Sequence, residues 1–176
     1  MVRKTLKGDQ RAFKALYEFY SAWLYSLAMR YSNSPQDAQD ALQEGFVRVY
    51  TNLKQFSQES NFKAWIKRII IHAALAQHKK KNAQVFENTS DVTADLFDLD
   101  YTLLNRLNSD ELFYYIDKLS PGRKQIFSAY YIEGFNHREI AELFGISEGT
   151  SKSQLFDAKK ELKKALELNL AVTKKS

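Results

Sequence analysis

Apolar residues recur at helical spacing along most of the chain, and this pattern predicts an all-helical protein. The first segment, residues 10–31, has one apolar side that is typical of a helix facing a core. The second begins at Ser34, an N-cap followed by proline at the first helical position, and runs to about residue 53. A third covers residues 62 to about 82. The apolar side of the first helix consists of Phe13, Leu16, Tyr17, Tyr20, Leu24 and Leu27.

A change in composition divides the chain. From Glu87 to Asp100 there are five acidic residues and no basic one, which is typical of a linker. We therefore expect two small helical domains, residues 1–84 and 109–176, joined by an acidic linker at residues 85–108.

The second half ends in a helix-turn-helix pattern. Further helices are predicted at residues 110–119 and, after a serine cap and Pro121, from there to Gly134. Next comes a short helix with Ile140, Leu143 and Phe144 at helical spacing. Gly145 follows where a positive φ is needed, and Ser147 caps a long last helix.

The outer face of this last helix carries hydroxyl, amide and cationic groups that can read base edges and hold phosphates. The pattern thus predicts duplex-DNA binding. The alternative is an ordinary helical hairpin with a solvated lysine face. The candidate contacts are Ser147, Thr150, Ser151, Lys152, Gln154, Lys159 and Lys160.

The second helix has an acidic side. Only Glu44 has a cation one turn on, Arg48, whereas a merely solubilising helix usually supplies more such pairs. A negative patch on a basic protein is a candidate protein-docking surface, and a plain solvated face is the alternative. Gly45 and nearby alanines predict close approach of a neighbouring helix. The docking candidates are Asp37, Asp40, Gln43 and Glu44.

The third helix is basic, with no acidic residue between Ser60 and Phe86. An aromatic residue among cations suits a nucleic acid whose bases stack while its phosphates are neutralised. A buried tryptophan beside solvated lysines is the alternative. The candidate contacts are Asn61, Lys63, Trp65, Lys67, Arg68 and His72.

Composition narrows the class of protein. The formal charge of +5 favours a polyanionic partner, and the absence of cysteine excludes disulfides and zinc–thiolate sites. No apolar run is long enough for a membrane helix, and the chain starts without a signal core, so we expect a soluble cytoplasmic protein.

No catalytic, metal or cofactor site is predicted. The run Gly145–Gly149 matches the G-x-S-x-G nucleophile elbow in letters, but that motif needs a strand before the serine and a helix is expected there. His72 and His78 are six residues apart and do not share a helix face as metal ligands would. We expect no enzymatic activity.

Taken together, the two halves resemble an extracytoplasmic-function (ECF) sigma factor of the sigma-70 family. The run DAQDALQEGFVRVY is similar to sigma region 2.2, and NFKAWIKRIIIHAALAQHKKK to regions 2.3 and 2.4. The run LSPGRKQIFSAYYIEGFNHREIAELFGISEGTSKSQLFDAKKEL is similar to region 4. The resemblance covers essentially the whole chain, with nothing like regions 1.1 or 3.

The resemblance implies a transcription initiation factor that binds core RNA polymerase and directs it to promoters. The acidic side of the second helix then falls where the family binds the coiled coil of the largest core subunit. The basic third helix and the loop at residues 58–62 fall where the −10 element is melted and held as single strand. The last helix, with Glu148 among its contacts, falls in the major groove at the −35 element, and Arg138 falls beside it on phosphate. The linker lies toward the RNA exit path, and an anti-sigma factor is a typical partner.

The sequence departs from the family in the last helix, where the common G-T-V-K-S-R reads G-T-S-K-S-Q. Ser151 replaces an inward apolar residue and is expected to bond back along its helix, and Gln154 replaces an arginine. Asp157 adds a negative charge, so recognition of the −35 element is expected to be weak or assisted by a recruiting protein. The competing interpretation of the chain is a stand-alone helix-turn-helix repressor or activator that never associates with core polymerase and whose N-terminal domain dimerises or binds an effector. A third interpretation is an adaptor that does not bind DNA, built on a degenerate sigma-factor scaffold.

Overall fold

The computed structural model describes residues 1–57, 61–81 and 109–173, and all regular structure within these ranges is helical, as predicted. The chain forms two compact units, Met1–Gln84 and Val85–Ser176. The predicted linker at residues 85–108 and the loop residues 58–60 lie outside the described residues.

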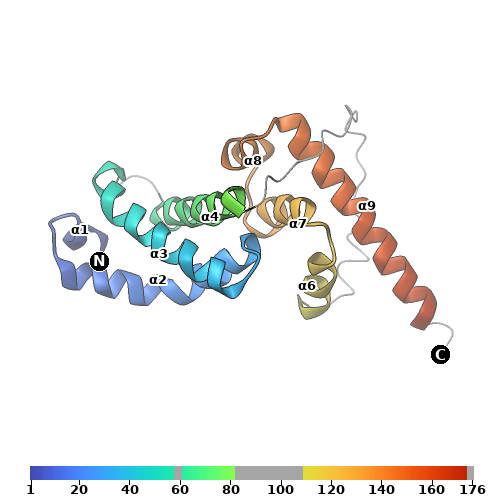
Figure 1. Ribbon diagram of the computed structural model, residues 1–176, viewed down its shortest axis with the longest axis horizontal. Coiled ribbons are helices and arrows are strands. Elements are labelled where there is room, and N and C mark those ends of the chain that lie inside the picture. Colours follow the sequence, from blue (N-terminus) through green and yellow to red (C-terminus); the bar gives the residue numbers. More distant parts are fainter. Residues whose placement is uncertain (58–60, 82–108, 174–176) are drawn as a thin grey trace. The chain divides into compact units, whose positions relative to one another are not determined.

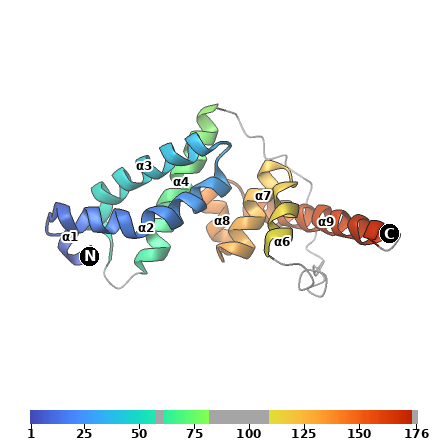
Figure 2. The same cartoon turned by 90° about the horizontal axis from the view of Figure 1, so that it is seen from below.

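The N-terminal unit is built from three long helices. A short helix, α1 (Val2–Thr5), precedes α2 (Gln10–Tyr31), α3 (Pro35–Asn52), the 3₁₀ turn η1 (Leu53–Gln55) and α4 (Phe62–Lys81). Helices α2, α3 and α4 lie side by side (Figures 1 and 2). Their shared core contains fully buried Leu16, Leu24, Val49, Ile66 and Ile70.

The starts of α2 and α3 are fixed by side-chain caps. The Asp9 carboxylate accepts the backbone N–H groups of Arg11 and Ala12 at 2.9 and 3.1 Å. The Ser34 hydroxyl oxygen accepts the N–H of Asp37 at 3.1 Å, with Pro35 at the first helical position. Each cap satisfies N–H groups that a helix leaves unpaired at its start, so these boundaries follow from the sequence.

Helices α3 and α4 approach each other closely at Gly45. A Cβ placed on Gly45 would overlap Cδ1 of the fully buried Ile70 and lie 3.5 Å from its Cα atom. The prediction of a close helix crossing at this glycine is confirmed.

The C-terminal unit contains α6 (Ser109–Asp117), α7 (Pro121–Phe127), the π-helical turn η2 (Ser128–Ile132), α8 (His137–Phe144) and α9 (Glu148–Thr173). Helix α9 packs on α6, α7 and α8. Its inward stripe is Leu155, Ala158, Leu162 and Leu166.

One predicted helix of this unit has a different form. Residues 121–133 were expected to be a single helix with a serine cap, but the hydroxyl of Ser120 makes no capping hydrogen bond. After Phe127 the helix widens into η2, where the N–H of Glu133 donates to the carbonyl of Ser128 at 3.0 Å. Gly134, with φ of 74°, then ends the segment as expected.

Candidate nucleic-acid and protein interfaces

The acidic side of α3 carries Asp40, Gln43 and Glu44, which we call the acid face; Gln43 and Glu44 are exposed and Asp40 is half-exposed. Asp40 accepts a hydrogen bond from Nε2 of Gln36 at 3.1 Å, and Glu44 is paired with Arg48 at 2.9 Å. Both bonds join positions one turn apart on the surface, where such pairs contribute little to stability. The carboxylates therefore remain accessible to a partner.

The placement of Asp37 on this surface is wrong. Its side chain is only 7% exposed, and it lies beside Ala38 and one turn before Ala41, which are both fully buried. The position turns its carboxylate toward the protein within the first turn of α3, where the unpaired N–H groups favour a negative charge. Asp37 is thus a structural residue of the helix start.

An apolar residue that sequence reasoning missed joins the acid face. Val47 lies four residues after Gln43 and is 59% exposed, so an apolar side chain stands beside the acidic ones. The signal in the sequence was its position on the polar side of the helical period.

Aromatic rings gather at the start of α4. Phe56, Phe62 and Trp65 have ring centroids 5.2–5.7 Å apart, and Tyr20 of α2 approaches Phe62 at 5.7 Å. We call Phe56, Phe62, Trp65 and Tyr20 the aromatic cluster. Trp65 is half-buried within the cluster. One part of its side chain packs against the protein, and another part is accessible to a stacked base.

Helix α4 carries polar and cationic groups before, beside and after Trp65 in sequence. The ammonium of Lys63 lies over the ring of Trp23 at 4.8 Å, and Lys63 and His72 are exposed, with Lys67 and Arg68 half-exposed. Asn61 is exposed and caps α4, since its Oδ1 accepts the N–H of Ala64 at 3.2 Å. Cations thus flank partly accessible rings, an arrangement suited to single-stranded nucleic acid.

The predicted helix-turn-helix is present. A reciprocal capping box joins Asn136 and Glu139 at the start of α8, with both hydrogen bonds 3.0 Å long. Gly145 adopts the left-handed conformation at φ 69° and ψ 42°. The Ser147 hydroxyl then accepts the N–H of Thr150 at 2.9 Å and begins α9. The Asn136 cap was missed, although its signature of asparagine followed three residues later by glutamate stands in the sequence.

Most of the predicted duplex-binding residues are accessible. Ser147, Glu148, Lys152 and Lys160 are exposed, and Thr150 and Lys159 are half-exposed. The hydroxyls of Ser147 and Thr150 share a hydrogen bond of 2.9 Å. Arg138 on α8 is exposed and reaches Glu142 at 3.5 Å, a surface pair that leaves it able to meet a phosphate.

Two residues were assigned wrongly to the outer face of α9. Ser151 is fully buried and Gln154 is 5% exposed. They lie one turn before Leu155 and Ala158 of the inward stripe, so the helical period directs both side chains inward. Neither can read a base in this arrangement.

The buried hydroxyl of Ser151 is bonded to His137. Its Oγ lies 2.9 Å from Nδ1 of His137, which replaces the expected bond back along α9. The ring of His137 stacks on that of Tyr130 in η2, with centroids 4.9 Å apart. Burial lowers the pKa of His137 below 6.5, and Lys152 and Lys159 lower it further, whereas Glu148 acts in the opposite direction.

The negative charge of Asp157 is balanced. The guanidinium of Arg123 in α7 reaches Asp157 at 3.3 Å and Glu161 at 2.9 Å, which fastens α7 to α9. Asp157 therefore opposes DNA binding less than its sequence position suggested.

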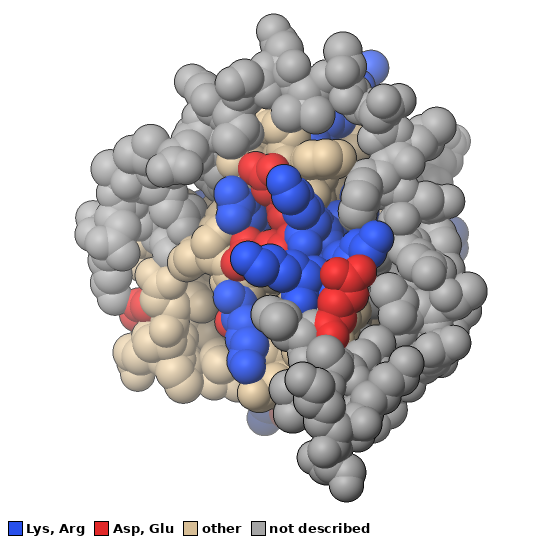
Figure 3. Space-filling model, turned by 90° about the vertical axis from the view of Figure 1, so that its right-hand side faces the viewer, with Lys and Arg blue, Asp and Glu red and all other residues tan. Residues whose placement is uncertain are grey.

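On the side where α9 ends, lysine and arginine side chains gather with acidic ones among them (Figure 3).

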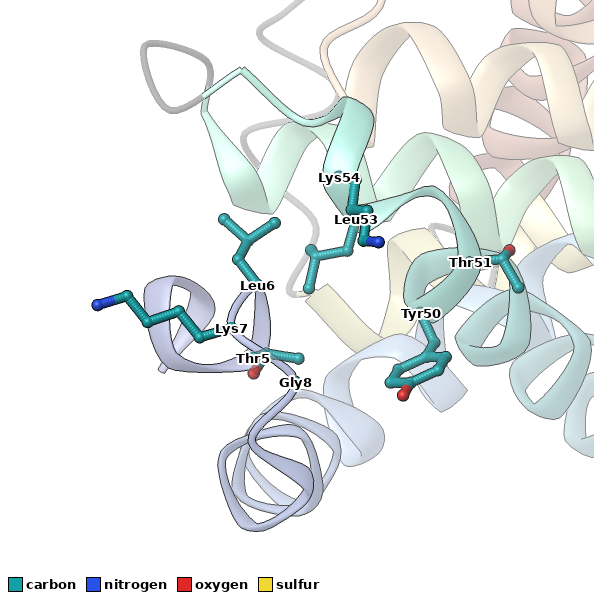
Figure 4. Close-up of a pocket in the computed structure, with 8 residues that line it drawn as sticks. All are labelled: Thr5, Leu6, Lys7, Gly8, Tyr50, Thr51, Leu53 and Lys54. Carbon is teal, nitrogen blue, oxygen red and sulfur yellow. The ribbon is translucent and has the colours of Figure 1, made fainter.

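The N-terminal unit also has an open hollow of about 520 Å³ between α1 and the end of α3. Leu6, Tyr50, Leu53 and Lys54 line it, and Lys7 lies at its edge with its side chain extending away (Figure 4). In the described parts of the chain no three His, Asp or Glu side chains are grouped as metal ligands, and no helix has the length and apolar character to cross a membrane.

Two stretches of this chain match families of known proteins. Residues 16–84 match sigma-70 region 2, and residues 109–162 match sigma-70 region 4. The chain belongs to the sigma-70 family. Because both regions occur in order, it is an alternative sigma factor, a transcription initiation factor that directs core RNA polymerase, and the stand-alone regulator is not favoured.

Relatives along the whole chain place this sigma factor in the ECF class. It is 29% identical to the RNA polymerase sigma-H factor of Pseudomonas aeruginosa, over 95% of this chain and 92% of that protein. It is also 29% identical to the ECF RNA polymerase sigma-E factor of Haemophilus influenzae, over 95% and 94% of the two chains. The sigma factor RpoE of Bartonella quintana, solved in complex with the anti-sigma factor NepR, has a similar fold. That similarity has a TM-score of 0.57 at 20% identity and covers 89% of this chain and 98% of that one.

Proposed function

We propose that this sigma factor divides promoter recognition between its two units. The N-terminal unit, residues 1–84, binds core polymerase and melts the −10 element. Residues 109–176 of the C-terminal unit read duplex DNA at the −35 element, and residues 85–108 link this part to the N-terminal unit. The observation that carries this division is that regions 2 and 4 of one family fall on separate units.

The acid face is the proposed contact with the coiled-coil helices of the largest core subunit. Half-exposed Asp40 and exposed Gln43 and Glu44 lie along one side of α3, and Val47 adds an exposed apolar group at its end. Protein interfaces commonly combine apolar groups, which are buried on binding, with charged groups that select the partner.

The start of α4 is the proposed site for the melted −10 strand. Flipping a base out of the duplex requires a few kcal/mol, which stacking on an aromatic ring offsets by about 1–3 kcal/mol per base. Trp65 is the stacking ring, and the surrounding groups hold the strand. The proposed contacts are Asn61, Lys63, Trp65, Lys67, Arg68 and His72.

The exposed side of the helix-turn-helix is the proposed −35 contact. Lys152 and Lys159 neutralise phosphates, with Arg138 beside them, and the hydroxyls of Ser147 and Thr150 are placed to meet base edges or backbone. Glu148 supplies a hydrogen-bond acceptor on this face. Ser151 and Gln154 are not included, because they are buried.

We further propose a cytoplasmic location, associated with the nucleoid when active, because both core polymerase and promoter DNA are found there in bacteria. The chain contributes binding and no catalysis of its own, and it uses no cofactor. An anti-sigma factor is a proposed partner, supported by the complex in which the Bartonella quintana relative was solved.

Core binding is tested by charge reversal on the acid face. The variant Asp40→Lys/Glu44→Lys should lose at least about tenfold in affinity for core polymerase, since each reversal places a cation where an anion is needed. Run-off transcription should fall in parallel. Glu18→Lys on α2, another exposed acid with a lysine partner one turn away, is the matched control and should bind normally. Unchanged affinity of the double variant would remove α3 as the docking surface.

A further inference from the structure

We propose that His137 and Ser151 form a positioning pair that sets how α9 presents its DNA-facing side chains. The inference rests on the proposed −35 function of the helix-turn-helix. Neither residue touches DNA in this proposal. Their hydrogen bond acts through the neighbours of Ser151 in sequence, Thr150 and Lys152, which point outward.

The need for the pair arises from the buried hydroxyl. A valine at this position would hold the helix by apolar packing alone. Serine provides less apolar surface and adds a hydroxyl that is fully removed from water. A buried polar group without a partner destabilises a protein by about 1–3 kcal/mol, so this position requires a hydrogen-bond partner.

His137 is the partner, and it is held from a third element. Nδ1 of His137 lies 2.9 Å from Oγ of Ser151, and either group can be the donor. The imidazole stacks on Tyr130 at an interplanar angle of 29°. The pair thus connects η2, the first residue of α8 and the first turn of α9.

The directional nature of the bond is what makes the pair positional. Apolar packing tolerates small rotations, whereas a hydrogen bond weakens steeply when its geometry changes. Rotation of the first turn of α9 would lengthen the His137–Ser151 bond and move Lys152 at the same time. The bond therefore favours one orientation of this turn relative to α8.

A pair of nearly isosteric substitutions tests the proposal. Ser151→Thr retains the hydroxyl. Ser151→Val introduces a side chain of almost the same shape as threonine, but without the hydroxyl. Each variant of the full chain is assembled with core polymerase. The probe is a promoter fragment whose start site has been mapped by sequencing transcripts after overexpression of this chain.

We expect Ser151→Val to raise the Kd for the fragment about fivefold, the factor that corresponds to one buried hydrogen bond. Ser151→Thr should remain within about twofold of the wild type. In a His137→Ala background the valine substitution should add no further loss, because the partner is already absent. A fragment shortened to remove the duplex upstream of the −10 element should bind all variants equally, which distinguishes a defect in the helix-turn-helix from loss of core binding.

The outcomes separate the two proposals. If wild-type holoenzyme binds the full fragment and Ser151→Val and Ser151→Thr do so with equal Kd, the positioning pair is refuted while the proposed function stands. If the wild-type holoenzyme gains no affinity from the upstream duplex, the −35 function fails and the pair fails with it.

Discussion

Gly45 has no room for a side chain where α3 packs against α4. Gly45→Ala should destabilise the N-terminal unit by about 1–2 kcal/mol. Overpacking in a core typically destabilises by about 1–3 kcal/mol, as expected here against Ile70. The higher helix propensity of alanine offsets at most about 1 kcal/mol of this. Urea unfolding followed by tryptophan fluorescence measures this unit alone, since both tryptophans of the chain, Trp23 and Trp65, belong to it.

Two further variants control this prediction. Gly149→Ala should leave the tryptophan transition unchanged, because its Cβ would meet only Oγ of Ser147 at an ordinary 3.6 Å, in the other unit. Ile70→Val removes the methyl group that collides, so Gly45→Ala/Ile70→Val should lose less stability than the two single changes added together. An unfolding midpoint for Gly45→Ala equal to the wild type's would contradict the close crossing.

Residue-level predictions from the sequence were correct where one local requirement decides the outcome. A glycine that permits a close crossing, as at Gly45, or a positive φ, as at Gly145, can be recognised without knowing the partner element. Asp37, Ser151 and Gln154 were assigned to the surface wrongly because each flanks an apolar stripe. At a flank the helical period leaves burial undecided, and the neighbouring helix determines it.

Helix boundaries were also predictable, because caps and glycines mark them locally. The starts of α2, α3 and α9 coincide with the predicted ones to within a residue. The π-helical turn η2 was not predicted, since the extra residue in its hydrogen-bonded ring leaves no mark in the apolar pattern. It nevertheless matters for the site, because it carries Tyr130, on which His137 stacks.

The junction of η2, α8 and α9 should depend on pH. Burial and the nearby ammonium groups of Lys152 and Lys159 lower the pKa of His137, only partly opposed by Glu148. The unfolded chain therefore binds more protons than the folded one between the folded pKa and 6.5. Stability of the C-terminal unit accordingly rises with pH across this window and is lost as pH falls through it.

Two NMR measurements check this dependence. The ring signals of His137 should titrate below pH 6.5 in the native chain and near the ordinary value in concentrated urea. The urea midpoint of amide signals from α8 and α9 should be lower at pH 5 than at pH 7.5, with a smaller difference in His137→Gln. A native His137 that titrates at or above 6.5 would show that burial is not the dominant influence on the ring.

At the scale of the whole molecule, the sequence predicted two helical units and the family, because both depend on patterns that span many residues. The roles of individual side chains depend on contacts with polymerase and DNA, which no pattern in one chain contains. The proposed division of labour has a consequence at this scale: a defect in one unit should be separable from a defect in the other within the same holoenzyme.

Promoter opening and promoter binding should respond to different substitutions. Lys152→Ala removes one phosphate contact, so it should weaken binding at every promoter sequence and reduce the slope of log K against log salt by about 1. Trp65→Ala removes about 1–3 kcal/mol of stacking, so at saturating holoenzyme it should lower the fraction of promoters that are open. Permanganate reactivity of thymines at the −10 element measures that fraction.

A template with the −10 element already unpaired distinguishes the two effects. Unpairing no longer has to be offset by stacking there, so the opening defect of Trp65→Ala should disappear at saturation, whereas the higher Kd of Lys152→Ala should persist on the intact upstream duplex. Fluorescence of the remaining Trp23 verifies that the N-terminal unit of Trp65→Ala is folded. If Lys152→Ala lowers the open fraction at saturation, the C-terminal unit acts on the opening step that we assign to the N-terminal unit. If Trp65→Ala leaves the open fraction unchanged on duplex DNA, Trp65 does not support opening. Either result contradicts the roles assigned to the two units.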